Sequence, residues 1–194
     1  AGAARTERSK YLAANATLET AEPKVALFNS IALVVPLDKS LKAKRAAMQG
    51  ALATYGQALD YGVAPVTTAA TYGMAELYRR LAADLLASQR PAGLDQEALE
   101  QYDVLLEEQA FPFEEQAITL HETNAGRVAT GLYDDWVRRS FEALAKLKPA
   151  RYAKAEIAES SAGQGLESPA PDVAAGSSGS TAGAQPAPIP PAAA

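Results

Sequence analysis

The strongest constraint on the fold is a regular stripe of apolar residues in the middle of the chain. Its members are separated by three or four residues each time: Val66, Ala70, Met74, Leu77, Leu81 and Leu85. This spacing brings side chains onto one face of an α-helix, whereas a strand would bring alternate residues together. We therefore predict an amphipathic helix that begins at Pro65 and ends near Gln89.

A second apolar stripe precedes the first and is expected to pair with it. Its members share one helical face: Leu41, Met48, Leu52, Tyr55 and Leu59. Small residues flank this stripe at Ala47, Ala51 and Ala58, which lets a neighbouring helix approach closely. Gly62 and Pro65 then end one helix and open the next, so the two stretches are predicted to form a helical hairpin.

The helices at the two sides of this hairpin are predicted from their boundary residues. Residues 5–35 are expected to be helical with a break near Pro23, because a proline disfavours helical geometry in the residue before it. The helix with Leu41–Leu59 is counted as the first and the helix with Val66–Leu85 as the second. Asp95 is then expected to cap the N-terminus of a third helix. Its predicted buried face consists of Leu99, Tyr102, Leu105 and Leu106.

A break between helices is expected at Phe111-Pro112, and two further helices are expected after it. Pro112 suits the first turn of a fourth helix, which Gly131 would close, and a fifth helix would stop at Pro149. The predicted inward face of the fourth helix consists of Phe113, Ala117, Leu120 and Val128. That of the fifth consists of Tyr133, Val137, Phe141 and Leu144, with Trp136 beside them.

The composition changes near residue 158, from a chain that is 48% apolar to a run of Ala, Pro, Ser and Gly. Such a run buries too little apolar surface to offset the entropy of ordering it. We predict a helical domain at 1–157 and a disordered tail at 158–194. Since the chain starts with Ala1 rather than Met, we also expect it to be the C-terminal part of a longer polypeptide.

These elements predict an all-α protein, either a bundle or a stack of antiparallel helical hairpins. The stack is favoured by residues 47–59 and 69–78, which resemble the second helix of one tetratricopeptide repeat followed by the first helix of the next. No regular 34-residue repeat runs through the chain. The expected fold is therefore the end of a solenoid built from degenerate repeats of this kind.

Charge and composition disfavour several classes of partner. The formal net charge of −5 provides no basic field for nucleic acid or for an anionic membrane surface. No apolar run approaches the length of about 18 residues that spans a bilayer. The absence of cysteine excludes disulfides and thiolate metal sites.

The sequence also lacks an evident catalytic set. The single histidine, His121, has no carboxylate three or four residues away on a helix, so a packed histidine is favoured over a metal ligand. Acidic residues precede basic ones by four positions in several places, as in Glu76 and Arg80, which is typical of an exposed helical face. We expect no enzyme activity, no bound metal and no cofactor.

Aromatic residues are the best candidates for binding. Tyrosines within the predicted helices are expected to pack between hairpins, but Tyr72 with Arg79 could line a groove that receives a partner segment. An alternative is a ligand pocket between the third and fifth predicted helices, around Tyr102, Phe113 and Trp136.

Several stretches resemble the C-terminal region of large tetratricopeptide-repeat proteins of the Gram-negative bacterial envelope. They are residues 61–72, 112–124, 131–147 and 149–154. The run Tyr-Asp-Asp-Trp-Val at 133–137 is the most specific part of this resemblance. It implies a non-catalytic protein-interaction scaffold, periplasmic or associated with the outer membrane. The implied partners are proteins of an envelope complex, such as TonB/ExbB/ExbD-type motor components. A periplasmic helical ligand-binding or accessory domain is the alternative.

Overall fold

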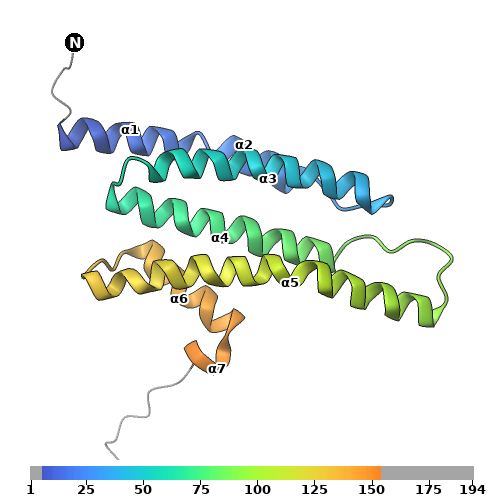
Figure 1. Ribbon diagram of the computed structural model, residues 1–194. Helices are drawn as coiled ribbons and strands as arrows, with labels where there is room; N and C mark the ends of the chain where they lie inside the picture. Colours follow the sequence, from blue (N-terminus) through green and yellow to red (C-terminus); the bar gives the residue numbers. More distant parts are fainter. Residues whose placement is uncertain (1–5, 154–194) are drawn as a thin grey trace, which may run out of the picture. The chain divides into compact units, whose positions relative to one another are not determined.

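The computed structural model describes residues 6–153, and these residues form helices joined by short turns and loops (Figure 1). The elements are α1 (Glu7–Glu19), α2 (Glu22–Ser30), α3 (Leu37–Leu59), α4 (Ala64–Leu86), α5 (Gln96–Gly126), a 3₁₀ turn (Arg127–Thr130), α6 (Asp135–Leu147) and α7 (Pro149–Tyr152). The described part of the chain contains no strand, which confirms the all-α prediction. The predicted tail at 158–194 lies outside the described residues.

From α2 onward, each helix packs against the next one along the chain, whereas α1 packs on α3 and α4. The α1–α2 pair lies along α3, α3 contacts α4, α4 contacts α5, and α5 contacts α6, which also reaches back to α4 (Figure 1). The core between α2, α3 and α4 is almost entirely apolar. Its largest buried members are Phe28, Leu33, Met48, Leu52, Leu77, Leu81 and Leu85.

Local sequence signals explain several helix boundaries. The carboxylate of Asp95 accepts a hydrogen bond from the Ala98 N–H at 2.9 Å, so it caps α5 as expected. The predicted break near Pro23 is confirmed, because α1 ends before it and Pro23 lies in the first turn of α2. Gly62 has a φ of 60° between α3 and α4, a conformation in which glycine meets no Cβ penalty.

The predicted helix over residues 5–35 is too long. The helix ends at Ser30, and residues 31–36 lie outside any helix. This stretch contains the β-branched Ile31, Val34 and Val35 and leads into Pro36, which disfavours helical geometry in the residue before it.

The predicted boundary at Pro112 is wrong, because this residue lies inside the single long helix α5. A proline in a helix removes one N–H donor, here the one that would reach the carbonyl of Glu108. Both Pro112 and Glu108 are exposed, so water can solvate the carbonyl that has lost its donor. Packing of both halves of α5 against α4 then outweighs the local preference for a break.

Three residues predicted to be buried are exposed: Leu105, Val128 and Tyr133. In the continuous helix, the buried positions Leu106 and Ala110 set the register, and Leu105 points away from that stripe. Val128 falls in the 3₁₀ turn after α5, and Tyr133 precedes the α6 cap, so neither lies on the helix face assumed from the sequence.

No helix within residues 6–153 combines the length and the apolar character that crossing a membrane requires.

Candidate functional site

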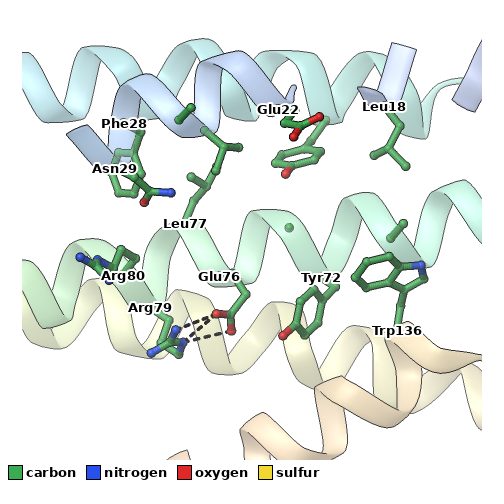
Figure 2. Close-up of a pocket in the computed structure, with 15 residues that line it drawn as sticks. Leu18, Glu22, Phe28, Asn29, Tyr72, Glu76, Leu77, Arg79, Arg80 and Trp136 are labelled. Carbon is green, nitrogen blue, oxygen red and sulfur yellow. Dashed lines mark hydrogen bonds and ion pairs between the residues drawn. The ribbon is translucent and has the colours of Figure 1, made fainter. Parts of the chain in front are cut away.

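A cleft of about 580 Å³ has α2 and α4 as its two long walls. Figure 2 shows its lining side chains, most of which come from these helices, with Leu18 from α1, Tyr55 from α3 and Trp136 from α6. We refer to it as the α2–α4 cleft. Segments far apart in the sequence therefore meet at one place, which is typical of binding sites.

The floor and sides of the α2–α4 cleft are largely apolar. Leu18, Val25 and Phe28 contribute from the first two helices, and Leu77 contributes from α4. Phe28 and Leu77 also belong to the buried core, so the cleft opens directly onto rigidly packed residues. A ligand that covers this floor would gain the free energy of apolar burial.

Gly73 allows α3 and α4 to come close at this cleft. A Cβ atom placed on Gly73 would lie 2.5 Å from Cζ of Tyr55, far inside van der Waals contact. The Tyr55 ring therefore lies directly against the backbone of α4, and burial raises the pKa of its hydroxyl. Any larger residue at position 73 must displace this ring and change the wall of the cleft.

Two aromatic rings from different helices meet at one end of the cleft. The ring centroids of Tyr72 and Trp136 lie 5.4 Å apart, and the Arg139 guanidinium lies 4.9 Å from the Trp136 ring on α6. Burial, followed by the nearby carboxylate of Glu76, raises the pKa of the Tyr72 hydroxyl. The hydroxyl is thus a neutral hydrogen-bonding group at neutral pH.

An ion pair between Glu76 and Arg79 forms the polar edge of the α4 wall (Figure 2). Nη2 of Arg79 lies 2.7 Å from Oε2 of Glu76, and Nε lies 3.0 Å from each carboxylate oxygen. Burial alone raises the pKa of Glu76, but the His121 and Arg79 contacts outweigh it and hold this pKa at about 2. Glu76 therefore stays ionised at neutral pH and is a poor general acid or base.

A network of buried polar groups lies behind this wall, between α4, α5 and α6. Nδ2 of Asn124 donates to the Thr68 carbonyl at 3.0 Å and to Ser140 Oγ at 3.2 Å. Nδ1 of His121 lies 3.3 Å from Ser140 Oγ, and its Nε2 lies 3.5 Å from Oε1 of Glu76, beyond an ordinary hydrogen-bond length. The network fixes α6, and so Trp136, relative to α4.

A second hollow of about 430 Å³ lies on the other side of the Tyr72, Glu76 and Arg79 side chains. Apart from Ala83 of α4, its remaining wall comes from α5 and α6 and carries charges of both signs, including Arg139 and Glu142. The three α4 residues therefore separate two concave surfaces. Tyr72 and Arg79 thus line concave surfaces, and binding of a partner segment there stays a prediction.

The predicted site residues separate into two groups. Tyr72, Arg79 and Trp136 all line the α2–α4 cleft. Phe113 instead stacks on Tyr78, with ring centroids 6.5 Å apart, and belongs to a shallow hollow elsewhere on the surface. Tyr102 is half-buried on α5 and lines none of the hollows described here. The structure therefore does not bring Tyr102, Phe113 and Trp136 together in one pocket.

Glu76 and Gly73 were not identified from the sequence as parts of a site. Glu76 follows Tyr72 by four residues and precedes Arg79 by three, so helical spacing placed all three on one face. The pairing of Glu76 with Arg80 that was predicted from the sequence is wrong, because Nε of Arg80 instead lies 2.9 Å from Oδ1 of Asp84. The role of Gly73 depends on Tyr55 of another helix and leaves no local signal.

The chemistry of the cleft suits recognition. Of its charged residues, Glu76, Arg79 and Arg80 are held in ion pairs, whereas Glu22 on α2 is exposed. Its aromatic groups are packed, and much of its lining is apolar. Within residues 6–153, no group of three histidine or carboxylate side chains is arranged to hold a metal ion. No family model, curated protein or solved structure matches the chain.

Proposed function

We propose that this chain is a non-catalytic binding module that takes up a segment of a partner protein in the α2–α4 cleft. The observation that carries this proposal is the combination of an apolar floor with an α4 edge whose charges are already paired. Arg79 is paired with Glu76, and Arg80 with Asp84, so a partner need not remove water from unpaired charges on this edge to reach the floor. On the opposite edge, Glu22 of α2 is exposed and can accept a hydrogen bond from the partner. The aromatic pair Tyr72 and Trp136 is the expected anchor point, because such residues dominate binding energy at interfaces.

The wider context that we propose is a scaffold of the bacterial envelope. The resemblance to tetratricopeptide-repeat proteins points to a periplasmic or outer-membrane-associated protein with partners such as TonB/ExbB/ExbD-type components. The consecutive packing of antiparallel helices supports this proposal, since a stack of hairpins buries its core in the same way. Degenerate repeats at the end of a solenoid would present such a cleft to a partner.

The test is photocrosslinking at the cleft in the native cell, with the protein as that cell expresses it. A crosslinking amino acid at Ala26, an exposed cleft residue, is expected to capture one protein, identified by mass spectrometry. The matched control places the same group at Ala46, which is exposed on α3 and does not line the cleft. Equal capture from both positions would contradict a specific site.

A second set of variants measures the affinity for the captured partner. Trp136→Ala is expected to weaken binding by more than about tenfold, which corresponds to loss of an aromatic anchor. Tyr133→Ala, an exposed aromatic residue outside the cleft, is the matched control and should leave the affinity unchanged. Circular dichroism of both variants shows whether the helical fold is retained.

A small-molecule ligand is the alternative, favoured by the cleft volume of about 580 Å³, which falls in the range of small-ligand sites. A ligand in the cleft would raise the melting temperature and change the fluorescence of Trp136, the single tryptophan of the chain. Such a shift without any protein crosslinked at Ala26 would favour the alternative.

A further inference from the structure

The outward face of α5 carries large apolar side chains that the fold does not use. Val104 is 54% exposed, Leu105 55% and Phe111 62%. Val104 and Phe111 are two helical turns apart and so lie on the same side of α5. The buried residues Leu106 and Ala110 lie on the opposite side, against the rest of the domain. These exposed residues are therefore outside the core.

The same face is strongly acidic. Between Gln96 and Gly126, helix α5 contains no Lys or Arg. Its acidic residues are Glu97, Glu100, Asp103, Glu107, Glu108, Glu114, Glu115 and Glu122. Within residues 6–153, ion pairs engage only Asp103 and Glu122 of this set. We call Val104, Glu108, Phe111 and Glu115, which follow one another at helical spacing, the acidic-apolar face.

This arrangement is unfavourable for the isolated chain on two counts. Exposure of apolar side chains such as Phe111 to water is unfavourable, and carboxylates three residues apart on the helix repel one another, as in Glu97 and Glu100. Both costs disappear if a partner covers the apolar residues and supplies positive charge. Acidic residues around exposed apolar residues therefore favour a partner surface that has basic residues around apolar ones.

We propose that the acidic-apolar face of α5 binds a basic amphipathic helix of a partner protein. Such a helix would place apolar residues at helical spacing against Val104 and Phe111, with Lys or Arg on both sides facing Glu108 and Glu115. A phosphate-bearing surface is disfavoured because the carboxylates would repel it. A symmetric contact with a second copy would bring Glu108 of each copy towards the same carboxylates of the other.

The acidic-apolar face shares no residue with the α2–α4 cleft. The proposal therefore goes beyond the proposed function and gives the module a second binding surface. A scaffold with two separate surfaces can hold two partners at once, which increases the effective concentration of one for the other.

The test uses the full chain and a fluorescent peptide of about 18 residues made of Leu, Lys and Ala, with the leucines at helical spacing. The expected result is binding in fluorescence anisotropy that weakens as salt is added. A peptide of the same composition in scrambled order, without an apolar stripe, is expected to bind more than about tenfold more weakly.

Variants locate the binding surface. The double variant Val104→Ser and Phe111→Ser is expected to weaken peptide binding more than about tenfold. Leu12→Ser, an exposed leucine on α1, is the matched control and should leave binding unchanged. Because exposed substitutions rarely affect folding, the double variant should keep its helical content. Glu108→Lys with Glu115→Lys is a second variant that should abolish binding through repulsion.

Four results would overturn the proposal. Equal binding of the scrambled peptide would show simple charge attraction, and full binding by both α5 variants would place the peptide elsewhere. A dimer in light scattering that becomes a monomer in the Val104 and Phe111 variant would identify a second copy as the occupant. Trp136→Ala should leave peptide binding unchanged. Loss of peptide binding in this variant would place the peptide in the α2–α4 cleft instead.

Discussion

The two sides of α4 are held to their neighbours by different interactions. Towards α2 and α3, the interface is apolar, with Leu81 and Leu85 fully buried among Phe28, Met48 and Leu52. Towards α5 and α6, the residues that meet include polar groups with no exposure at all: Thr68, His121, Asn124 and Ser140. One helix therefore has an apolar interface on one side and a hydrogen-bonded interface on the other.

The difference indicates how each interface contributes to the site. Apolar contacts are non-directional and tolerate a shift of one helix against another, whereas hydrogen bonds require one relative position. The polar side fixes the position of α6, whose Trp136 completes the cleft wall. The apolar side stabilises the fold through burial of side chains, and the polar side adds the alignment that the site needs.

The largest expected effect is on the apolar side. Leu81→Ala leaves a cavity at a fully buried position and should lower the free energy of unfolding by about 2–5 kcal/mol. Urea unfolding followed by circular dichroism measures it. The matched control Leu12→Ala, at an exposed leucine, should change the same quantity by less than about 0.5 kcal/mol. Equal effects of the two substitutions would contradict an apolar core centred on α4.

Lys44 is a charged exception on the apolar side, because its side chain is only 1% exposed. Nζ donates to the carbonyls of Phe28 and Ile31 at 3.0 and 2.7 Å and pairs with Asp84 at 2.7 Å. Lys44→Met keeps the apolar stem but leaves these groups without their donor, so it should cost about 3 kcal/mol. Lys42→Met, at an exposed position on the same helix, is the control in urea unfolding.

Two substitutions that nearly conserve side-chain volume compare the contributions of the two interfaces to stability. Asn124→Leu removes the donor to the Thr68 carbonyl and to Ser140, so it should cost about 1–3 kcal/mol although it adds apolar surface. On the other side, Leu81→Met should cost less than about 1.5 kcal/mol. Urea unfolding measures both, and a smaller cost for Asn124→Leu would contradict the role assigned to the network. Trp136 fluorescence should change only in the Asn124 variant.

The smallest effect concerns the charge at the edge of the cleft. The pKa of Glu76 is lowered to about 2 from its ordinary 4.5, so the unfolded chain takes up this proton at a higher pH than the folded one. Its contribution to stability is complete above pH 4.5 and is lost as the pH falls from there towards about 2. In urea unfolding at several pH values, Glu76→Gln should flatten this decline, and Glu108→Gln, at an exposed carboxylate, should not.

The candidate site was partly predictable because part of it lies on one helix. Tyr72 and Arg79 are two turns apart, so their common orientation follows from helical spacing alone. Trp136 could be named as an aromatic candidate, but its meeting with Tyr72 could not, since the two are separated by α5 in the sequence. Tyr102 and Phe113 are also aromatic residues on a predicted helix, but packing places them away from the cleft.

The sequence by itself determined where most helices lie, because helical periodicity and capping residues such as Asp95 act within a few residues of one another. Only the tertiary structure decided that α5 continues through Pro112, since packing on α4 outweighs the lost hydrogen bond. It also decided that Tyr55 lies against Gly73 and that Trp136 completes the cleft. Those contacts join helices distant in sequence, and their energies depend on the relative positions of the helices, which no local pattern specifies.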